Sequence, residues 1–185
     1  MILHWGGTLA GKNSQVSSLT RESQPSDPIK QAIKIMEEKQ SEEGRKDDKG
    51  CFILPQLKGS EFLICVNMKT LDNLFLFHYS WRNRKLNEVV DITYTSRWPA
   101  TMKFSNGKSE QVPSYLKSNF AWLQKNWKNT TFLPSHCKIT KKDNGGTDYE
   151  LTCNNPSGVS EKPHWSQKIP LSHITVHKNA FNSRK

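Results

Sequence analysis

The stretch that decides the fold is residues 50–94, which read GCFILPQLKGSEFLICVNMKTLDNLFLFHYSWRNRKLNEVVDITY. It holds the apolar run LFLF at 74–77 and two of the four cysteines. β-Branched and aromatic residues are frequent in 74–79 and 88–94, and the basic turn RNRK at 82–85 lies between them, so both segments are predicted strands. We expect the later sequence to pack against these strands and the earlier sequence to form an appendage.

The sequence before this stretch divides into a flexible arm at 1–27 and a short helix with a charged linker at 28–49. Gly, Ser, Thr, Gln and Asn are abundant in residues 6–27, which predicts a disordered arm. Asp27 followed by Pro28 is typical of a helix start. An apolar stripe then follows at helical spacing, made by Ile29, Ala32, Ile33 and Met36. The stripe predicts a helix that packs on the main domain or docks on a partner.

The four cysteines form two pairs around two turn signals. One pair is equidistant from Lys58 in the turn KGS, and the other is equidistant from Gly145 in the turn NGG. A turn at the midpoint places the two cysteines of a pair opposite each other on neighbouring strands, within reach of a disulfide. Four cysteines allow three pairings. We predict the hairpin disulfides Cys51–Cys65 and Cys137–Cys153; the alternative is four buried free thiols in a cytosolic protein.

The strongest helical pattern covers residues 114–128, directly after a proline. Its apolar face recurs at regular helical spacing and comprises Leu116, Phe120, Leu123 and Trp127. Short strands are predicted at 102–104 and 174–176. Residues 50–185 are therefore predicted to form a cationic α+β domain, a mostly antiparallel sheet covered by one main amphipathic helix. Lysines flank the apolar face, so the alternative for this helix is a membrane surface or a partner groove.

The net positive charge of the chain lies in residues 51–185. The net charge is +10, and residues 1–50 hold eight basic and eight acidic side chains. Residues 51–185 therefore hold 19 basic and 9 acidic groups (27 minus 8 and 17 minus 8). Such a surface favours polyanions, and a purely solubilising role for the charge is the alternative.

Basic residues on predicted turns and strand ends are the candidate partner-binding residues, because such positions can meet phosphate or sulfate groups. Two tryptophans beside them could stack on bases or sugars. The candidates are Arg82, Arg84, Lys85, Arg97, Lys103, Lys138, Lys141 and Lys142, with Trp81 and Trp98.

No catalytic residue, metal site or cofactor is predicted. The chain has no G-x-S-x-G, H-E-x-x-H, P-loop or G-x-G-x-x-G motif, and its cysteines lack the C-x-x-C spacing of zinc sites. His173 and His177 lie four residues apart on a predicted strand, about 13 Å from each other, which is too far for one metal ion. His136 and His164 are expected to be ordinary surface or core residues.

The compartment is predicted to be extracellular. No apolar run is long enough to span a membrane, and the disulfide framework is typical of oxidising compartments. Asn129 begins the glycosylation sequon Asn-Thr-Thr. An intracellular location, cytosolic or nuclear, is the alternative if the cysteines are free.

The strand–turn–strand at 77–94 resembles the hairpins of small secreted guanyl-specific ribonucleases. The same fold occurs in non-catalytic secreted effectors of plant-pathogenic fungi, and those proteins also place a helix before a β-sheet and use few disulfides. The resemblance covers less than a fifth of the chain. Where the final histidine of the enzymes falls, this sequence has Thr93. The resemblance therefore implies the fold and not the catalysis.

These features predict a secreted basic binding protein with an effector-like role. It is expected to act by binding a partner and not by catalysis. Its partner is expected to be a macromolecule, either a protein or a polyanion such as RNA or a glycan. The alternative is an RNA-binding protein or a small secreted ribonuclease with the ribonuclease-like fold.

Overall fold

The computed structural model describes residues 27–39, 49–53, 62–142, 148–158 and 163–176. The predicted arm, apart from Asp27, most of the charged linker and the turns of both cysteine hairpins lie outside these residues. The elements in chain order are α1 (Pro28–Lys39), β1 (Lys49–Ile53), β2 (Phe62–Asn67), β3 (Phe75–Ser80), β4 (Lys85–Tyr94), β5 (Thr101–Phe104), β6 (Ser109–Gln111), the 3₁₀ helix η2 (Ser114–Phe120), α2 (Ala121–Asn126), β7 (Thr130–Phe132), η3 (Pro134–His136), β8 (Cys137–Lys141), β9 (Tyr149–Cys153), β10 (Trp165–Ile169), η4 (Leu171–His173) and β11 (Thr175–Val176).

Helix α1 begins where the sequence predicts. The Asp27 side chain accepts the backbone N–H of Ile29 at 2.9 Å, so it satisfies one of the donors that a helix start leaves free. Pro28 is the first helical residue and has no N–H to satisfy. Ala32, Ile33 and Met36 are buried, which confirms that this face packs on the domain.

The large sheet, sheet A, has eight antiparallel strands in the order β11-β1-β2-β3-β4-β5-β6, with β7 paired to β4. Within this sheet, strand β4 pairs with β3, β5 and β7. Val89 pairs with β3 and β5, and Ile92 pairs with β5 and β7. A strand has only two edges, so β3 and β7 lie end to end along one edge of β4 while β5 occupies the other.

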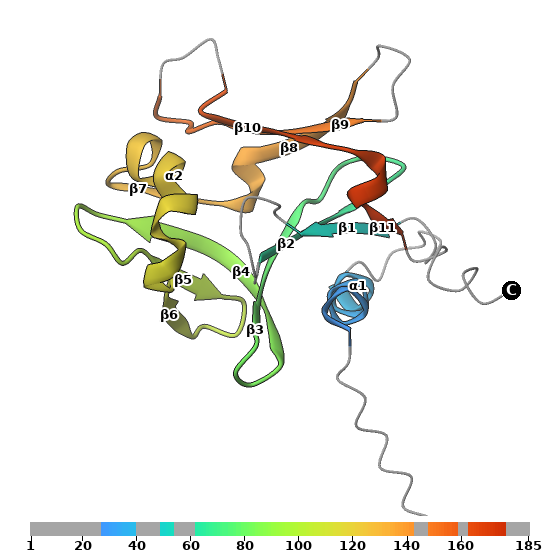
Figure 1. Ribbon diagram of the computed structural model, residues 1–185, viewed down its shortest axis with the longest axis horizontal. Coiled ribbons are helices and arrows are strands. Elements are labelled where there is room, and N and C mark those ends of the chain that lie inside the picture. Colours follow the sequence, from blue (N-terminus) through green and yellow to red (C-terminus); the bar gives the residue numbers. More distant parts are fainter. Residues whose placement is uncertain (1–26, 40–48, 54–61, 143–147, 159–162, 177–185) are drawn as a thin grey trace, which may run out of the picture.

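The smaller sheet, sheet B, holds three antiparallel strands in the order β10-β9-β8. It covers one face of sheet A together with η2 and α2, and α1 covers the other face. Figure 1 shows sheet B across the top of the molecule and α1, seen end-on, on the opposite side of β1. The fold is therefore a mostly antiparallel α+β arrangement of three layers.

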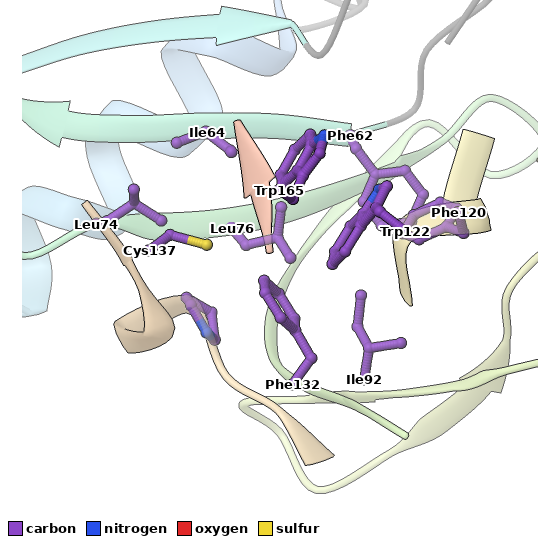
Figure 2. A pocket seen from close by; sticks show the side chains of 11 residues that line it. Phe62, Ile64, Leu74, Leu76, Ile92, Phe120, Trp122, Phe132, Cys137 and Trp165 are labelled. Atoms are coloured by element: carbon purple, nitrogen blue, oxygen red, sulfur yellow. The ribbon is translucent and has the colours of Figure 1, made fainter. Parts of the chain in front are cut away.

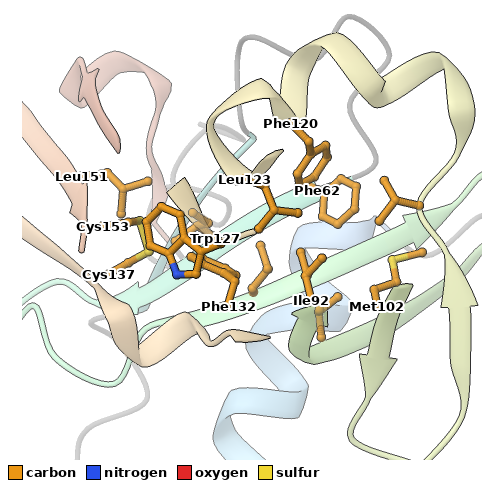
Figure 3. Packing of buried hydrophobic residues seen from close by; sticks show 14 of the residues in the cluster. Phe62, Ile92, Met102, Phe120, Leu123, Trp127, Phe132, Cys137, Leu151 and Cys153 are labelled. Carbon is orange, nitrogen blue, oxygen red and sulfur yellow. A yellow bond between two sulfur atoms is a disulfide. The ribbon is translucent and has the colours of Figure 1, made fainter. Parts of the chain in front are cut away.

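Two hydrophobic clusters fill the spaces between these layers. The smaller one joins α1 to sheet A and includes Met36, Leu63 and Phe77. The larger one joins sheet A to sheet B, η2 and α2. Figure 3 shows Phe120, Leu123 and Trp127 pointing from the helical segment into this larger core.

The segment 114–128, predicted to be the main helix, differs from that prediction. It forms the 3₁₀ helix η2 followed by the six-residue α2, so α1 with 12 residues is the longer helix. The first part of the segment contains two serines, a tyrosine and an asparagine, which are weaker helix formers than alanine or leucine. The predicted apolar face is nevertheless buried at all four positions, Leu116, Phe120, Leu123 and Trp127.

Both predicted disulfides are present. Cys51 lies opposite Cys65 on β1 and β2, and Cys137 lies opposite Cys153 on β8 and β9. The sulfur atoms of each pair are bonded, with Cα–Cα distances of 4.1 Å and 4.0 Å. Each disulfide therefore joins neighbouring strands of one sheet, and neither links the two sheets.

Candidate functional site

The β3–β4 hairpin carries the most exposed cluster of candidate residues. Ser80 and Lys85 form the last pair of the ladder, and residues 81–84 make the turn. Arg84 has a positive φ of 54°, and the Asn83 side chain accepts the backbone N–H of Lys85 at 3.2 Å. An Asx bond of this kind organises a turn locally. The turn is thus held by backbone and side-chain geometry at the end of a long hairpin.

Trp81 is anchored at this turn but leaves most of its surface in water. Its ring packs edge-on against buried Tyr79, with centroids 4.9 Å apart. The residue is nevertheless 59% exposed. Aromatic residues are enriched at interfaces relative to the rest of the surface, so this exposed tryptophan is a candidate contact residue.

The basic neighbours of Trp81 are all exposed: Arg82, Arg84 and Lys85. Among the described residues the ion pairs are Lys39–Glu88 and Lys142–Glu150, so the three cations have no acidic partner there. We name Trp81, Arg82, Arg84 and Lys85 the basic tip.

Lys108 adds a cation at the same end of sheet A, and the sequence prediction did not include it. It follows the turn of the β5–β6 hairpin, where Gly107 has a φ of 81° and Asn106 accepts the Lys108 N–H at 2.9 Å. This turn joins the β4 strand through a bond from the Ser105 N–H to the Glu88 carbonyl at 3.0 Å. The signal for it was present in the sequence as an Asn-Gly dipeptide followed by a lysine.

The remaining candidates do not join the basic tip. Arg97 and Trp98 follow the opposite end of β4, about 30 Å along the strand from Lys85. Trp98 is half-buried, and its ring centroid lies 6.3 Å from that of Phe120. It therefore packs against the hydrophobic core. Its side chain is therefore less available for stacking than Trp81.

The four other basic candidates lie elsewhere on the two sheets. Lys103 sits opposite Asp91 across β4 and β5. Lys138 and Lys141 belong to β8 in sheet B, and Lys142 follows them and pairs with Glu150. The structure thus distributes the predicted cations over the basic tip, the far end of β4, strand β5 and strand β8.

Asn129 lies between α2 and β7 with its side chain exposed. Its φ is 60°, a left-handed conformation that asparagine tolerates better than most residues. Its backbone N–H donates to the Tyr94 carbonyl at 2.9 Å. The residue that a glycan would modify is therefore exposed, and its modification stays a prediction.

Two histidines take part in the aromatic core and not in an exposed catalytic arrangement. His136 Nδ1 accepts the Trp127 Nε1–H at 3.4 Å and the Leu133 N–H at 3.2 Å. Burial lowers the pKa of His136 below its ordinary value. His164 Nδ1 accepts the Asn155 N–H at 3.1 Å, and its ring stands edge-on to Trp127. His173 is exposed, while His177 lies outside the described residues.

An apolar pocket lies in the seam between sheet A, α2 and sheet B. Trp122 and Trp165 stack in parallel above it, with centroids 4.4 Å apart and planes 4° apart. Figure 2 shows these two indoles on one side of the pocket and Phe132 with Ile92 on the other. The cavity volume is about 10 Å³. Sequence patterns did not reveal this pair, because Trp122 lies off the predicted helical face.

Metal-ligating side chains do not gather in groups of three or more anywhere in the described part of the chain. No helix among the described residues is long and apolar enough to cross a membrane. Comparisons of the chain with family models, with curated proteins and with solved structures found no match. The resemblance of 77–94 to ribonuclease hairpins therefore stays a prediction, although the hairpin itself is present as β3–β4.

Proposed function

We propose that this chain is a secreted binding protein that holds an anionic macromolecule with its basic tip and performs no catalysis. The observation that carries the proposal is the 59% exposure of Trp81 among three exposed cations. An indole in water forgoes the free energy of burial, so its retention at the tip is best explained by a partner that covers it.

The chemistry of the tip favours sulfate, phosphate or carboxylate groups. Arginine presents a planar fork of donors that matches such oxyanions in pairs, and lysine adds a point charge. An exposed indole stacks on sugars or bases without sequence preference. The hairpin supplies a rigid mount, since the ladder extends to the Ser80–Lys85 pair. Little conformational entropy would be lost on binding.

Secretion is supported by the two disulfides and by the exposure of the sequon residue Asn129. Disulfides persist in oxidising compartments, and each of these bonds closes a short hairpin loop of 14 or 16 residues in sequence separation. The exposure of Asn129 is compatible with glycosylation on the secretory route.

The test compares the affinity of the full-length oxidised chain for a sulfated glycan and for single-stranded RNA at physiological salt. The tip variant is Arg82→Gln/Arg84→Gln/Lys85→Gln. The matched control, Arg97→Gln/Lys138→Gln/Lys141→Gln, removes the same charge from other places. We expect the tip variant to lose at least about tenfold in affinity and the control to lose much less. Equal losses would contradict a localised site.

Trp81→Ala separates stacking from charge in the same assay. It should weaken binding by about 1–3 kcal/mol while the charge of the tip is unchanged. Degradation of the RNA during the assay would instead support the ribonuclease alternative and would contradict a purely binding role. Binding that survives high salt would indicate a protein partner held by apolar contacts.

A further inference from the structure

The pocket beneath the stacked indoles has a structural origin in sheet A. Strands β3 and β7 both pair with β4 along the same edge, but the β3 ladder ends at Val89 and the β7 ladder begins at Ile92. The side chains that flank this break, Leu76 and Phe132, both line the pocket. The space therefore follows from the strand register and not from one badly fitting side chain.

The lining of the pocket is apolar throughout. It is made by aliphatic and aromatic side chains, a proline and the Cys137 side chain, whose sulfur is in a disulfide. A buried water needs two to four polar partners, and no polar atom of these side chains, the two indole N–H groups included, faces the pocket. Apolar cavities of this kind stay dry and accept apolar guests.

The two indoles above the pocket differ in how firmly they are held. Trp122 makes ring contacts with Phe120, Trp127 and Phe132 as well as with Trp165. Among the described residues, Trp165 makes a ring contact only with Trp122. It is half-buried and stands at the first position of β10, which is an edge strand of sheet B. Trp165 is thus held by fewer ring contacts than Trp122.

We infer that this pocket is a binding site for a slender apolar group, a single aromatic ring or an unbranched hydrocarbon chain, which enters when the Trp165 ring turns outward. The closed pocket has room for about one water molecule. Outward movement of one indole adds the volume that a ring or chain needs. The guest then replaces Trp165 against the face of Trp122 and contacts Phe132 and Ile92. Any polar end of the guest stays outside, because the inner wall has no partner for it.

The test uses the full-length oxidised chain with toluene and with octanoate as separate probes. The readout is the indole N–H resonance of Trp165, assigned by comparison with Trp165→Phe. We expect a saturable shift of this resonance with at least one probe. The exciton signal of the stacked indoles in circular dichroism should fall with the same midpoint. If neither probe produces a saturable shift up to its solubility limit, the inference is wrong.

Two substitutions separate this site from general apolar association. Leu74 is half-buried and lines the pocket. Leu74→Phe should therefore fill the pocket and lower its affinity for the probe by at least about tenfold. Leu171→Phe is the matched control at a site that is 40% exposed and outside the pocket, and it should leave the affinity unchanged. Equal affinities in both variants would overturn the assignment.

Trp165→Ala tests the moving ring without altering the inner wall, and it covers the case in which Leu74→Phe does not fold. Removal of the indole should speed the entry of the probe. An unchanged entry rate would show that Trp165 does not control access.

Discussion

Arg84 holds a left-handed backbone conformation at the point where the basic tip returns to β4. This region is unfavourable for residues with a Cβ atom, whereas glycine enters it freely. Arg82, two residues earlier in the same turn, does not share the positive φ. The two arginines are therefore equal in charge and unequal in backbone strain. An arginine at the strained position is consistent with a side chain kept for its charge.

Arg84→Gly should raise the free energy of unfolding by about 0.5–1 kcal/mol, because relief of the left-handed strain exceeds the added entropy of the unfolded chain. Arg82→Gly should lower it, since only the entropic loss applies there. Denaturant unfolding of both variants measures the difference. Equal destabilisation would show that the backbone at Arg84 is unstrained.

The lowered pKa of His136 makes the free energy of unfolding depend on pH. Its Nδ1 accepts two N–H donors, and burial lowers its pKa below the ordinary value of 6.5. Between the folded and unfolded pKa values the unfolded chain binds more protons, so stability rises with pH in that window. The contribution is complete above the unfolded pKa and is lost as the pH falls through 6.5 toward the folded pKa.

The free energy of unfolding should therefore decrease as the pH falls through 6.5, with a slope from this residue of at most about 1.4 kcal/mol per pH unit. His136→Asn keeps an acceptor oxygen near the Nδ1 position and does not titrate, so it should flatten the profile. His173→Asn, at an exposed residue, is the control and should leave the profile unchanged. A profile that stays steep in His136→Asn would assign the pH dependence to other groups.

At the scale of elements, the apolar face of 114–128 was predicted correctly and its helix type was not. Burial of Leu123 and Trp127 follows from spacing, because residues four apart share a side of an α-helix. Leu116 and Phe120 are also four apart and buried, but they lie in the 3₁₀ helix η2, where only residues three apart are aligned, so their burial depends on tertiary packing. The choice between a 3₁₀ helix and an α-helix depends on tertiary packing of the first turns, which spacing does not report. The cysteine pairs were predictable because their register depends on local sequence and not on tertiary packing. A turn predicted at the midpoint of each pair sets the register of the two strands.

Trp127→Ala should lower the free energy of unfolding by about 3–5 kcal/mol, because this side chain is completely buried and its removal leaves a cavity. Trp81→Ala removes the same side chain from the exposed tip and should change stability by less than about 0.5 kcal/mol. The two variants make the same substitution at a buried and at an exposed position, so the difference in their free energies of unfolding reports the effect of burial. A small effect of Trp127→Ala would contradict the packing of α2 on the sheets.

At the scale of the whole molecule, the sequence predicted the antiparallel sheet, the helix on the domain and the disulfides. It did not predict that the strands divide between two facing sheets, nor that β7 would extend the β3 edge of β4 from a distance in sequence. Such pairings depend on which surfaces meet after collapse, and no turn signal marks them. The pocket was invisible for the same reason, since it lies where these non-local elements meet.

The net charge follows from the sequence alone, whereas the placement of the cationic residues comes from the structure. Residues 51–185 hold all of the excess positive charge, yet the structure distributes the candidates over the basic tip, the far end of β4 and sheet B. Among the described residues, the tip alone combines exposed cations with an exposed tryptophan. The central claim therefore concerns this one end of sheet A.

The salt dependence of binding to single-stranded RNA, used as a generic polyanion, tests that claim most directly. Each neutralised phosphate contributes about 0.7 to the slope of log affinity against log salt concentration. Arg82→Gln/Arg84→Gln/Lys85→Gln should therefore reduce the slope by about 2, and Arg97→Gln/Lys138→Gln/Lys141→Gln should leave it nearly unchanged. Equal slopes in the wild type and the tip variant, or a larger reduction in the control, would contradict binding through the basic tip.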